Sequence, residues 1–435
     1  MDVLSLVVYA APLTGITAYY VMRQQRIHNK HLQILEDTIA AGMTEPASLH
    51  PLIDPSKCLG CGTCVKACPE TSHHDVLGLI NGKAELIGPT DCIGHGACKT
   101  ACPLDAITLV FGTARRGLDI PLLKPTFESN VPGVYVAGEL GGMGLIKNAL
   151  TQGAQALEYI AKAGVKHPGA LDVLIVGAGP AGLAASLAAK KLGLKYHTVE
   201  QEALGGAVFQ YPRGKLVMTA PVELPLVGKV QFRNTTKEEL LKFWTEATNG
   251  NGLNITYQER VESVVQTNGV FHVKTSKGEH RASAILLGIG RRGTPRKLGV
   301  KGEERSKVVY RLIDPEQYKG QHVLVVGGGD SALEAAASIA ELGDTTVTLS
   351  YRGEAFQRAK QRNRQRVDEA VKNGQLNLLL NSNVKEIREQ DVLIKVAGEE
   401  ATLRNDAVIV SAGGILPNDF LKSIGIQVET KWGTE

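Results

Sequence analysis

Residues 173–189 read VLIVGAGPAGLAASLAA and decide the fold of the central part of the chain. Four apolar residues, a turn with Gly177, Gly179 and Gly182, and an alanine-rich stretch predict a strand, a tight turn and a helix. The next apolar stretch ends at Glu200. In a dinucleotide-binding fold the glycines let the pyrophosphate reach the helix N-terminus, and such an acid accepts hydrogen bonds from the ribose. The stretch therefore predicts a dinucleotide-binding domain.

A second unit of the same kind follows the apolar residues 323–326. Its next apolar stretch ends in Ser350, Tyr351 and Arg352 instead of an acid. A hydroxyl and guanidinium groups at this place suit the 2′-phosphate of NADP, whereas NAD sites carry a carboxylate. We therefore expect a site for NADPH, with NADH as the alternative, lined by Gly327, Gly329, Ala332, Arg352 and Arg358.

All seven cysteines lie between Cys58 and Cys102. An odd number in one dense cluster favours metal ligation in a reducing compartment over disulfide pairing. The first four and Pro69 have the C-x2-C-x2-C-x3-C-P spacing of iron–sulfur ligands. A second run follows, in which His95 stands where a cysteine is expected. A zinc site is the alternative, but zinc sites favour two separated pairs of ligands.

Residues 51–112 thus resemble the bacterial-type two-cluster ferredoxin domain. The resemblance implies that Cys58, Cys61, Cys64 and Cys102 hold the first 4Fe–4S cluster. It assigns to the second cluster Cys68, Cys92, Cys98 and His95. An imidazole in place of a thiolate removes a negative charge and raises the reduction potential. Three outcomes stay open for this site: a histidine-ligated cluster, a three-iron cluster with an empty corner, or a bystander histidine.

The two dinucleotide units end in the stretches 285–290 (ILLGIG) and 407–414 (AVIVSAGG). Together with the Gly205–Gly206 pair, residues 288–295 (GIGRRGTP) and residues 351–356 (YRGEAF), this tandem is similar to thioredoxin reductase-like flavoproteins, which include ferredoxin–NADP reductases. The resemblance implies an α/β fold with two Rossmann-like domains. It also implies FAD in the first domain and NAD(P)H in the second.

One segment of that family stands at a different place in this chain. The family finishes its flavin site with a C-terminal P-G-V-Y-A-A-G-D segment, whereas the matching residues here, 131–139 (VPGVYVAGE), precede the first fold. We therefore expect a circular permutation that places Gly138, Glu139 and Gln152 at the flavin. The permutation also predicts that the segment near residue 120 lies beside the C-terminus.

The N-terminal residues 3–22 (VLSLVVYAAPLTGITAYYVM) contain no charge and have about the length that spans a bilayer. Arg23, Arg26 and Lys30 follow, and the positive-inside rule then places the remaining chain in the cytoplasm. We therefore expect a transmembrane helix that anchors the protein in the inner membrane. A buried or interfacial helix is the alternative, because proline, glycine and hydroxyl residues dilute the run.

The expected domains are a transmembrane helix (3–22), a juxtamembrane stalk (23–50), a ferredoxin domain (51–112), a permuted flavin segment (113–170), an FAD domain (171–290), an NAD(P)H domain (291–410) and a return to the FAD domain (411–435). The length of 435 residues fits about three globular domains. A net charge of +4 with dispersed basic residues argues against nucleic acid as a partner. We expect the stalk residues His28 and His31 to be solvated.

No cysteine follows Cys102, so a cysteine pair beside the flavin, which disulfide reductases need, is excluded. The sequence predicts a membrane-anchored oxidoreductase that moves electrons between NAD(P)H, FAD and two iron–sulfur clusters, to or from a redox partner protein. The alternatives are a quinone reductase, an electron-transfer subunit of a larger membrane complex and, ranked last, a redox sensor. The sequence names no acid–base catalytic residue, and it leaves open whether the chain forms a homodimer.

Overall fold

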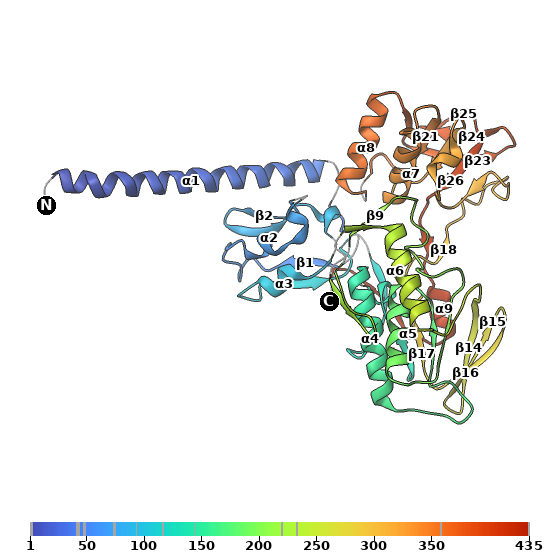
Figure 1. Ribbon diagram of the computed structural model, residues 1–435. Helices are drawn as coiled ribbons and strands as arrows, with labels where there is room; N and C mark the ends of the chain where they lie inside the picture. The colour runs from blue at the N-terminus through green and yellow to red at the C-terminus, as the bar shows by residue number, and fades with distance from the viewer. Residues whose placement is uncertain are drawn as a thin grey trace. The chain divides into compact units, whose positions relative to one another are not determined.

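The computed structural model describes residues 3–40, 44–46, 49–72, 75–92, 94–114, 117–142, 144–218, 221–231, 234–356 and 359–433; within these, the side chains of residues 3–11, 72, 216, 218 and 234 are not described. The chain divides into two compact units (Figure 1). Unit 1 comprises Met1–Arg116 with Gly433–Glu435, and unit 2 comprises Gly117–Trp432.

Unit 1 contains a long helix and a small two-fold repeat. Its elements are α1 (Val3–Ala40), β1 (His50–Ile53), α2 (Thr63–Ala67), η1 (Pro69–Ser72), β2 (Leu77–Ile80), β3 (Lys83–Leu86), η2 (Pro89–Asp91), α3 (Ala97–Ala101) and β4 (Ile107–Val110). Strands β1 and β4 pair antiparallel, as do β2 and β3. Gly62 and Gly96, with φ of 72° and 78°, precede the two short helices, and both helices end at a cysteine. The two cysteine runs therefore fold alike.

The expected transmembrane helix over residues 3–22 is wrong. In the part of the chain that the structure describes, no helix is long and apolar enough to cross a bilayer. Helix α1 shows no boundary at residue 22 and continues to Ala40 through charged residues. Thr14, Gly15 and Thr17 also interrupt its apolar side chains. The assignment to the inner membrane depended on this segment and is withdrawn with it.

The second half of α1 packs against β2. His31 is buried, and its Nδ1 accepts a hydrogen bond from the Leu79 N–H at 2.9 Å. The adjacent Lys30 forms an ion pair with Asp75, with 2.6 Å between Nζ and Oδ2. The expectation that His31 is solvated is therefore wrong. The contact joins residues 48 positions apart, so no local sequence pattern indicates it.

Unit 2 contains two parallel sheets. The first has the strand order β13-β8-β7-β17-β6 and consists of β6 (Val134–Val136), β7 (Val173–Val176), β8 (Tyr196–Val199), β13 (Ile255–Thr256) and β17 (Ile285–Leu287). Helices α4 (Ile146–Ala163) and α5 (Pro180–Lys191) cover one face. The antiparallel strands β14 (Val261–Thr267), β15 (Val270–Thr275) and β16 (Gly278–Ala282) cover the other. Both faces are thus buried, which explains why β7 and β17 are apolar throughout.

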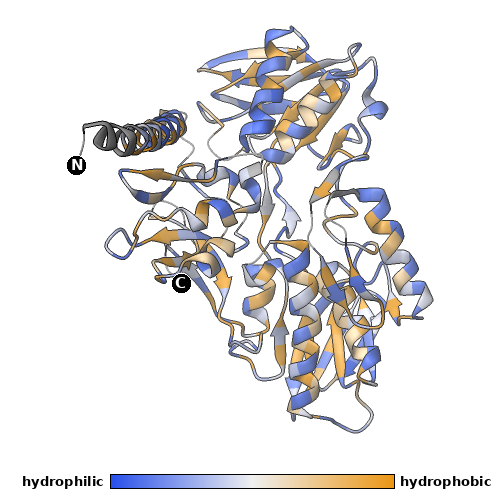
Figure 2. Ribbon diagram, turned by 60° about the vertical axis from the view of Figure 1, so that its left-hand side comes forward, coloured by the Kyte–Doolittle hydropathy of each residue, from blue (hydrophilic) through white to orange (hydrophobic). Residues whose placement is uncertain are grey.

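The second parallel sheet repeats this construction in the order β19-β26-β20-β21-β22. Its strands are β19 (Val308–Val309), β20 (His322–Val326), β21 (Thr346–Ser350), β22 (Leu376–Leu379) and β26 (Ala407–Val410). It packs against α7 (Asp330–Ala340) and α8 (Gln361–Lys372), and against β23 (Ser382–Ile387), β24 (Asp391–Val396) and β25 (Glu399–Arg404). Figure 2 shows that the strands of these sheets are mainly hydrophobic. The expected pair of dinucleotide-binding α/β domains is confirmed.

The remaining elements of unit 2 connect these layers. They are η3 (Glu139–Gly141), β9 (Leu216–Met218), β10 (Val222–Leu224), β11 (Gly228–Val230), β12 (Asn234–Thr236), α6 (Lys237–Gly250), β18 (Thr294–Pro295), η4 (Pro315–Tyr318), β27 (Gly414–Ile415) and α9 (Asn418–Ser423). Pairs β9–β12, β10–β11 and β18–β27 are antiparallel. A capping box at Thr236 and Glu239 starts α6, because each residue satisfies a backbone N–H of the other.

The segment near residue 120 lies beside the C-terminal segment, as expected. Strand β5 (Leu118–Pro121) pairs antiparallel with β28 (Val428–Lys431). The Asp119 carboxylate accepts hydrogen bonds from Thr430 and Asn418, each at 2.7 Å. Side chains from α9 and the residues after it also join the core of the first parallel sheet. The two ends of unit 2 therefore complete one domain together.

Candidate functional site

The first glycine turn is a close contact between β7 and α5. Gly177 has a φ of 103°, and a Cβ there would lie 2.6 Å from the Gly288 carbonyl oxygen. A Cβ on Gly182 would lie 1.7 Å from the Gly177 carbonyl oxygen. Gly179 is the N-cap of α5, and no side chain of the described residues caps this helix N-terminus with a hydrogen bond. This arrangement fits a pyrophosphate, which binds backbone N–H groups at such an end.

The acid expected at the ribose reaches this turn. Glu200 follows β8 and is buried. Its two carboxylate oxygens accept hydrogen bonds from the N–H groups of Ala178 (2.7 Å) and Glu202 (2.8 Å). Burial raises the pKa of Glu200, and these hydrogen bonds oppose the rise. Because each carboxylate oxygen has two lone pairs, capacity remains for ribose hydroxyls.

The Gly205–Gly206 pair packs on the same turn. Both residues have positive φ angles, 106° and 53°. The Gly205 N–H donates to the Ala178 carbonyl oxygen at 2.9 Å, and a Cβ on Gly206 would lie 3.1 Å from the Gly179 Cα. The pair therefore forms a second backbone wall of the site, where only glycine fits.

The segment that precedes the first fold reaches the site as well. The Gly138 N–H, just after β6, donates to Gln152 Oε1 on α4 at 2.9 Å. A Cβ on Gly138 would lie 3.2 Å from the Ala181 Cβ. A Cβ on Gly153 would lie 2.0 Å from the Ala181 carbonyl oxygen, so α4 and α5 touch backbone to backbone. The glycine turn, the acid, the glycine pair and the segment of Gly138 thus converge, and together they fit FAD.

Glu139 differs from its neighbours because its side chain is exposed. Partial loss of solvation raises the pKa of Glu139, and the positive charges of Arg291 and Arg292 oppose this rise. Arg291 is held by a 2.8 Å hydrogen bond from its Nη2 to the Asp119 carbonyl oxygen. Sequence reasoning did not single out these arginines as site residues, although they lie in the quoted GIGRRGTP stretch.

The second glycine turn has the same tight geometry. A Cβ on Gly327 would lie 2.3 Å from the Ser411 carbonyl oxygen and 3.0 Å from the Cβ of Ala332, which is fully buried. Gly329 is the N-cap of α7. The ring of Tyr351 covers Gly328, whose Cβ would lie 2.2 Å from it. The turn fits a second dinucleotide.

Two details change the expected 2′-phosphate contacts. Ser350 is fully buried, and its hydroxyl hydrogen-bonds to Ser382 Oγ at 2.8 Å, so this hydroxyl is not exposed for a 2′-phosphate. The side chain faces inward because it stands on β21 opposite the start of β23. Arg352 is exposed. Arg358 lies outside the described residues.

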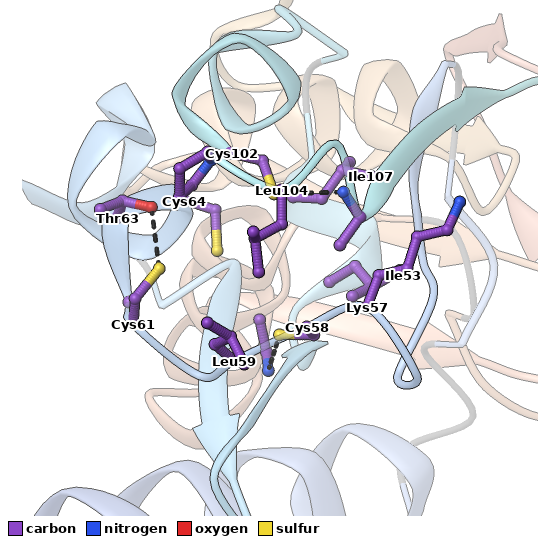
Figure 3. Close-up of a pocket in the computed structure, with 14 residues that line it drawn as sticks. Ile53, Lys57, Cys58, Leu59, Cys61, Thr63, Cys64, Cys102, Leu104 and Ile107 are labelled. Atoms are coloured by element: carbon purple, nitrogen blue, oxygen red, sulfur yellow. Dashed lines mark hydrogen bonds between the residues drawn. The ribbon is translucent and has the colours of Figure 1, made fainter.

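Four cysteines of unit 1 face one cavity of ≈ 100 Å³ (Figure 3). They are Cys58, Cys61, Cys64 and Cys102, the set expected for the first cluster. Cys58 Sγ accepts N–H groups from Gly60 and Ala84 at 3.4 Å, and Cys102 Sγ accepts one from Ala106 at 3.3 Å. Four soft sulfur ligands with N–H···S support in one pocket fit an iron–sulfur cluster.

The thiols of this cavity have different acidities. Hydrogen bonds from the Thr63 hydroxyl and N–H lower the pKa of Cys61, which is exposed. Burial raises the pKa of Cys64 to about 11. Cluster assembly must therefore remove a proton from a buried thiol that is neutral at physiological pH.

Cys68, Cys92 and Cys98 form the second group. Burial raises the pKa of each, that of Cys92 to about 11. The charges of neighbouring cysteines raise the pKa of Cys92 and Cys98 further. His95 Nδ1 accepts the Ala97 N–H at 3.1 Å. His95 Nε2 is buried and has no hydrogen-bond partner among the described residues. Burial lowers the pKa of His95, which leaves a neutral imidazole with an available lone pair.

Two dinucleotide folds with these sites define a two-domain flavoprotein reductase. Residues 174–434 match the pyridine nucleotide-disulphide oxidoreductase family, and the chain belongs to this family. Residues 50–103 match the 4Fe-4S dicluster domain. The chain is thus an NAD(P)H-dependent flavoprotein reductase with FAD and an iron–sulfur domain.

Three relatives illustrate the likeness. A ferredoxin–NADP reductase of Ignicoccus hospitalis is 31% identical over 60% of this chain and 83% of its own length. Bacilliredoxin reductase Bdr of Bacillus subtilis is 26% identical over 60% of this chain and 82% of its length. The solved structure of bacillithiol disulfide reductase Bdr from Bacillus cereus is 27% identical, with a TM-score of 0.53 over 59% of this chain and 82% of its own.

The glycine turn generates a first prediction. Gly182→Ala should yield folded protein without bound FAD, because the new methyl overlaps the Gly177 carbonyl and displaces α5. Flavin absorbance of the purified protein measures this. Gly250→Ala is the matched control, since nothing lies within 4 Å of its Cβ, and it should retain FAD. Full FAD occupancy in Gly182→Ala would contradict the assignment.

The thiol acidities generate a second prediction. In iron-free protein at neutral pH, iodoacetamide should label Cys61 first, because thiolates react and its pKa is lowered. Cys64 and Cys92 should react slowly and accelerate as the pH rises toward 11, where their thiolates form. Peptide mass spectrometry follows each site. Equal labelling of Cys61 and Cys64 at neutral pH would be inconsistent with this burial.

Proposed function

We propose that the chain transfers electrons between NADPH, FAD and two iron–sulfur clusters, to or from a redox partner protein. When bound, FAD exchanges hydride with the nicotinamide and single electrons with iron–sulfur centres. The observation that carries the proposal is the presence of both glycine-turn sites and the four-thiol cavity in one chain. The relative named ferredoxin–NADP reductase supports it.

The residues of the chain bind and orient the cofactors. The turn at Gly177 and Gly182 directs N–H groups of α5 to the FAD pyrophosphate, and Glu200 holds the ribose. The exposed Arg352 offers a guanidinium to the 2′-phosphate of NADPH, which favours NADPH over NADH. Arg291 and Arg292 supply positive charge beside Glu139.

A disulfide reductase is the second candidate, because the similar Bacillus cereus structure is named a bacillithiol disulfide reductase. Such an enzyme relays electrons to thiols through a cysteine pair beside the flavin. Residues 103–435 contain no cysteine. We therefore favour iron–sulfur electron transfer over dithiol chemistry.

We further propose that the reductase is circularly permuted. Strand β6 occupies the edge of the first sheet beside β17, and Gly138 and Gln152 meet at the glycine turn. The pairing of β5 with β28 supports the same connection. Matches that begin at residue 174 fit a chain whose last flavin segment stands before its first fold.

For the second cluster we propose ligation by Cys68, Cys92, Cys98 and His95 Nε2. The buried Nε2 has no hydrogen-bond partner in the described ranges, and an imidazole nitrogen in that state suits a metal. The hydrogen bond from the Ala97 N–H to His95 Nδ1 fixes the orientation of the imidazole ring.

An anaerobic titration tests the function. NADPH added to the full protein should bleach the flavin and produce EPR signals of reduced clusters, and it should act at lower concentration than NADH. Gly182→Ala without FAD is the control: its clusters should stay oxidised with NADPH and become reduced with dithionite. Clusters that stay oxidised in the wild type, or steady NADPH oxidation by a disulfide substrate, would contradict the proposal.

His95→Cys tests the second ligand set. A fourth thiolate adds a negative charge, so the potential of that cluster should fall by on the order of 100 mV. His95→Ala should lose iron from the same cluster. Redox titration followed by EPR, with iron analysis, measures both. Variants that match the wild type in potential and iron content would show that His95 is no ligand.

A further inference from the structure

Two histidines and a glutamate converge at the edge of the first parallel sheet, away from the sites described above. His197 stands on β8, His280 stands on β16, and Glu259 lies between β13 and β14. Each offers one donor atom, and these atoms all lie within 4.8 Å of one another. Three separate segments of unit 2 therefore supply one small donor set.

The strand geometry explains the convergence. Thr198 hydrogen-bonds to Ser186 on α5, so His197, the preceding residue on β8, faces the opposite side of the sheet. That side is covered by β14, β15 and β16. Strand β16 brings His280 over His197, and their rings stack with centroids 5.0 Å apart and planes 24° apart.

The carboxylate is the most buried member of the cluster. Glu259 is 4% exposed. Its Oε1 lies 2.7 Å from His280 Nε2 and accepts the Thr275 hydroxyl at 2.6 Å. The Thr256 hydroxyl lies 3.0 Å from His197 Nε2. Thr256 thus orients the His197 ring and Thr275 orients the Glu259 carboxylate, as the outer partners of metal-ligating residues do.

The charge states suit a cation. Burial raises the pKa of Glu259, but the hydrogen bonds from Thr275 and His280 outweigh it and leave the pKa below its ordinary value. Burial, and then the charge of His280, lowers the pKa of His197. An ionised carboxylate and a neutral imidazole are the forms that bind zinc.

A second histidine–glutamate pair lies in the β-meander formed by β14, β15 and β16, and it shows what a histidine–glutamate hydrogen bond without a third donor looks like. His272 Nδ1 lies 2.9 Å from Glu279 Oε1, and both side chains are exposed. Among the described residues, no third donor joins that pair, whereas His197 joins the cluster at Glu259. The hydrogen bond between His280 and Glu259 does not by itself explain why the second imidazole, that of His197, stacks on His280.

We propose that His197, Glu259 and His280 bind one divalent transition metal of the zinc class. Two imidazoles, one carboxylate and a water complete the four-coordinate set that zinc takes with such ligands. The metal ties β16 and the turn before β14 to strand β8. Because the Glu259 N–H donates to the Glu200 carbonyl oxygen at 2.8 Å, the metal also steadies the backbone of the ribose acid.

Calorimetric titration with Zn²⁺ tests the site. The full chain is used with its FAD and clusters in place, so that the cysteines are occupied. Wild-type protein should bind one Zn²⁺ per chain, and His280→Gln should weaken binding roughly tenfold or more. The glutamine amide can still donate to Glu259, so the variant keeps the fold. His272→Gln is the matched control from the same β-meander and should bind as the wild type does.

A thermal measurement gives a second readout. Zn²⁺ should raise the unfolding temperature of the wild type and of His272→Gln, and it should leave His280→Gln and His197→Gln unchanged, because a ligand stabilises only the state that binds it. Flavin absorbance verifies that each variant is folded. No Zn²⁺ binding by the wild type, or equal binding and equal stabilisation in His280→Gln, would overturn the proposal.

Discussion

The contact between the end of β7 and the start of α5 is the constraint on which the flavin-binding half of unit 2 depends. The Gly177 carbonyl occupies the space where a side chain of residue 182 would stand. This approach sets the helix N-terminus in front of the strand. Within the turn, the Ala178 N–H donates to Glu200 and the Ala178 carbonyl oxygen accepts from Gly205. Gly138 packs against Ala181 at the start of α5. Segments that are distant along the chain therefore meet at one backbone contact.

Features that follow from backbone geometry were predictable from the sequence. A glycine that must approach another backbone atom tolerates no other residue, so the turns at Gly177 and Gly327 carry a fixed pattern. The same holds for Cys58 and its partners, because a cluster demands soft ligands at fixed spacing. The pairing of the segment near residue 120 with the C-terminal strand was also expected, because residues 131–139 match a segment that stands at the C-terminal end in the related flavoproteins.

Features that depend on long-range packing were not predictable. An uncharged run such as residues 3–22 has the same composition whether it forms a separate membrane-spanning helix or the first part of a longer helix. Here it is the first part of α1, which continues to Ala40. Ser350 faces inward because a distant strand offers Ser382, and His31 is buried by a strand far along the chain. His197 and His280 are likewise 83 residues apart, and only the β-meander stacks them.

The pairing of β5 with β28 has a consequence for how the polypeptide folds as it leaves the ribosome. Strand β5 is synthesised directly after unit 1, but its partner follows the entire NAD(P)H-binding domain. The flavin-binding domain therefore stays incomplete until about three hundred further residues have been translated. The strand pairs of the small cysteine-rich unit span far shorter loops and do not depend on this last segment. The backbone around the iron site can thus form before that around the flavin site.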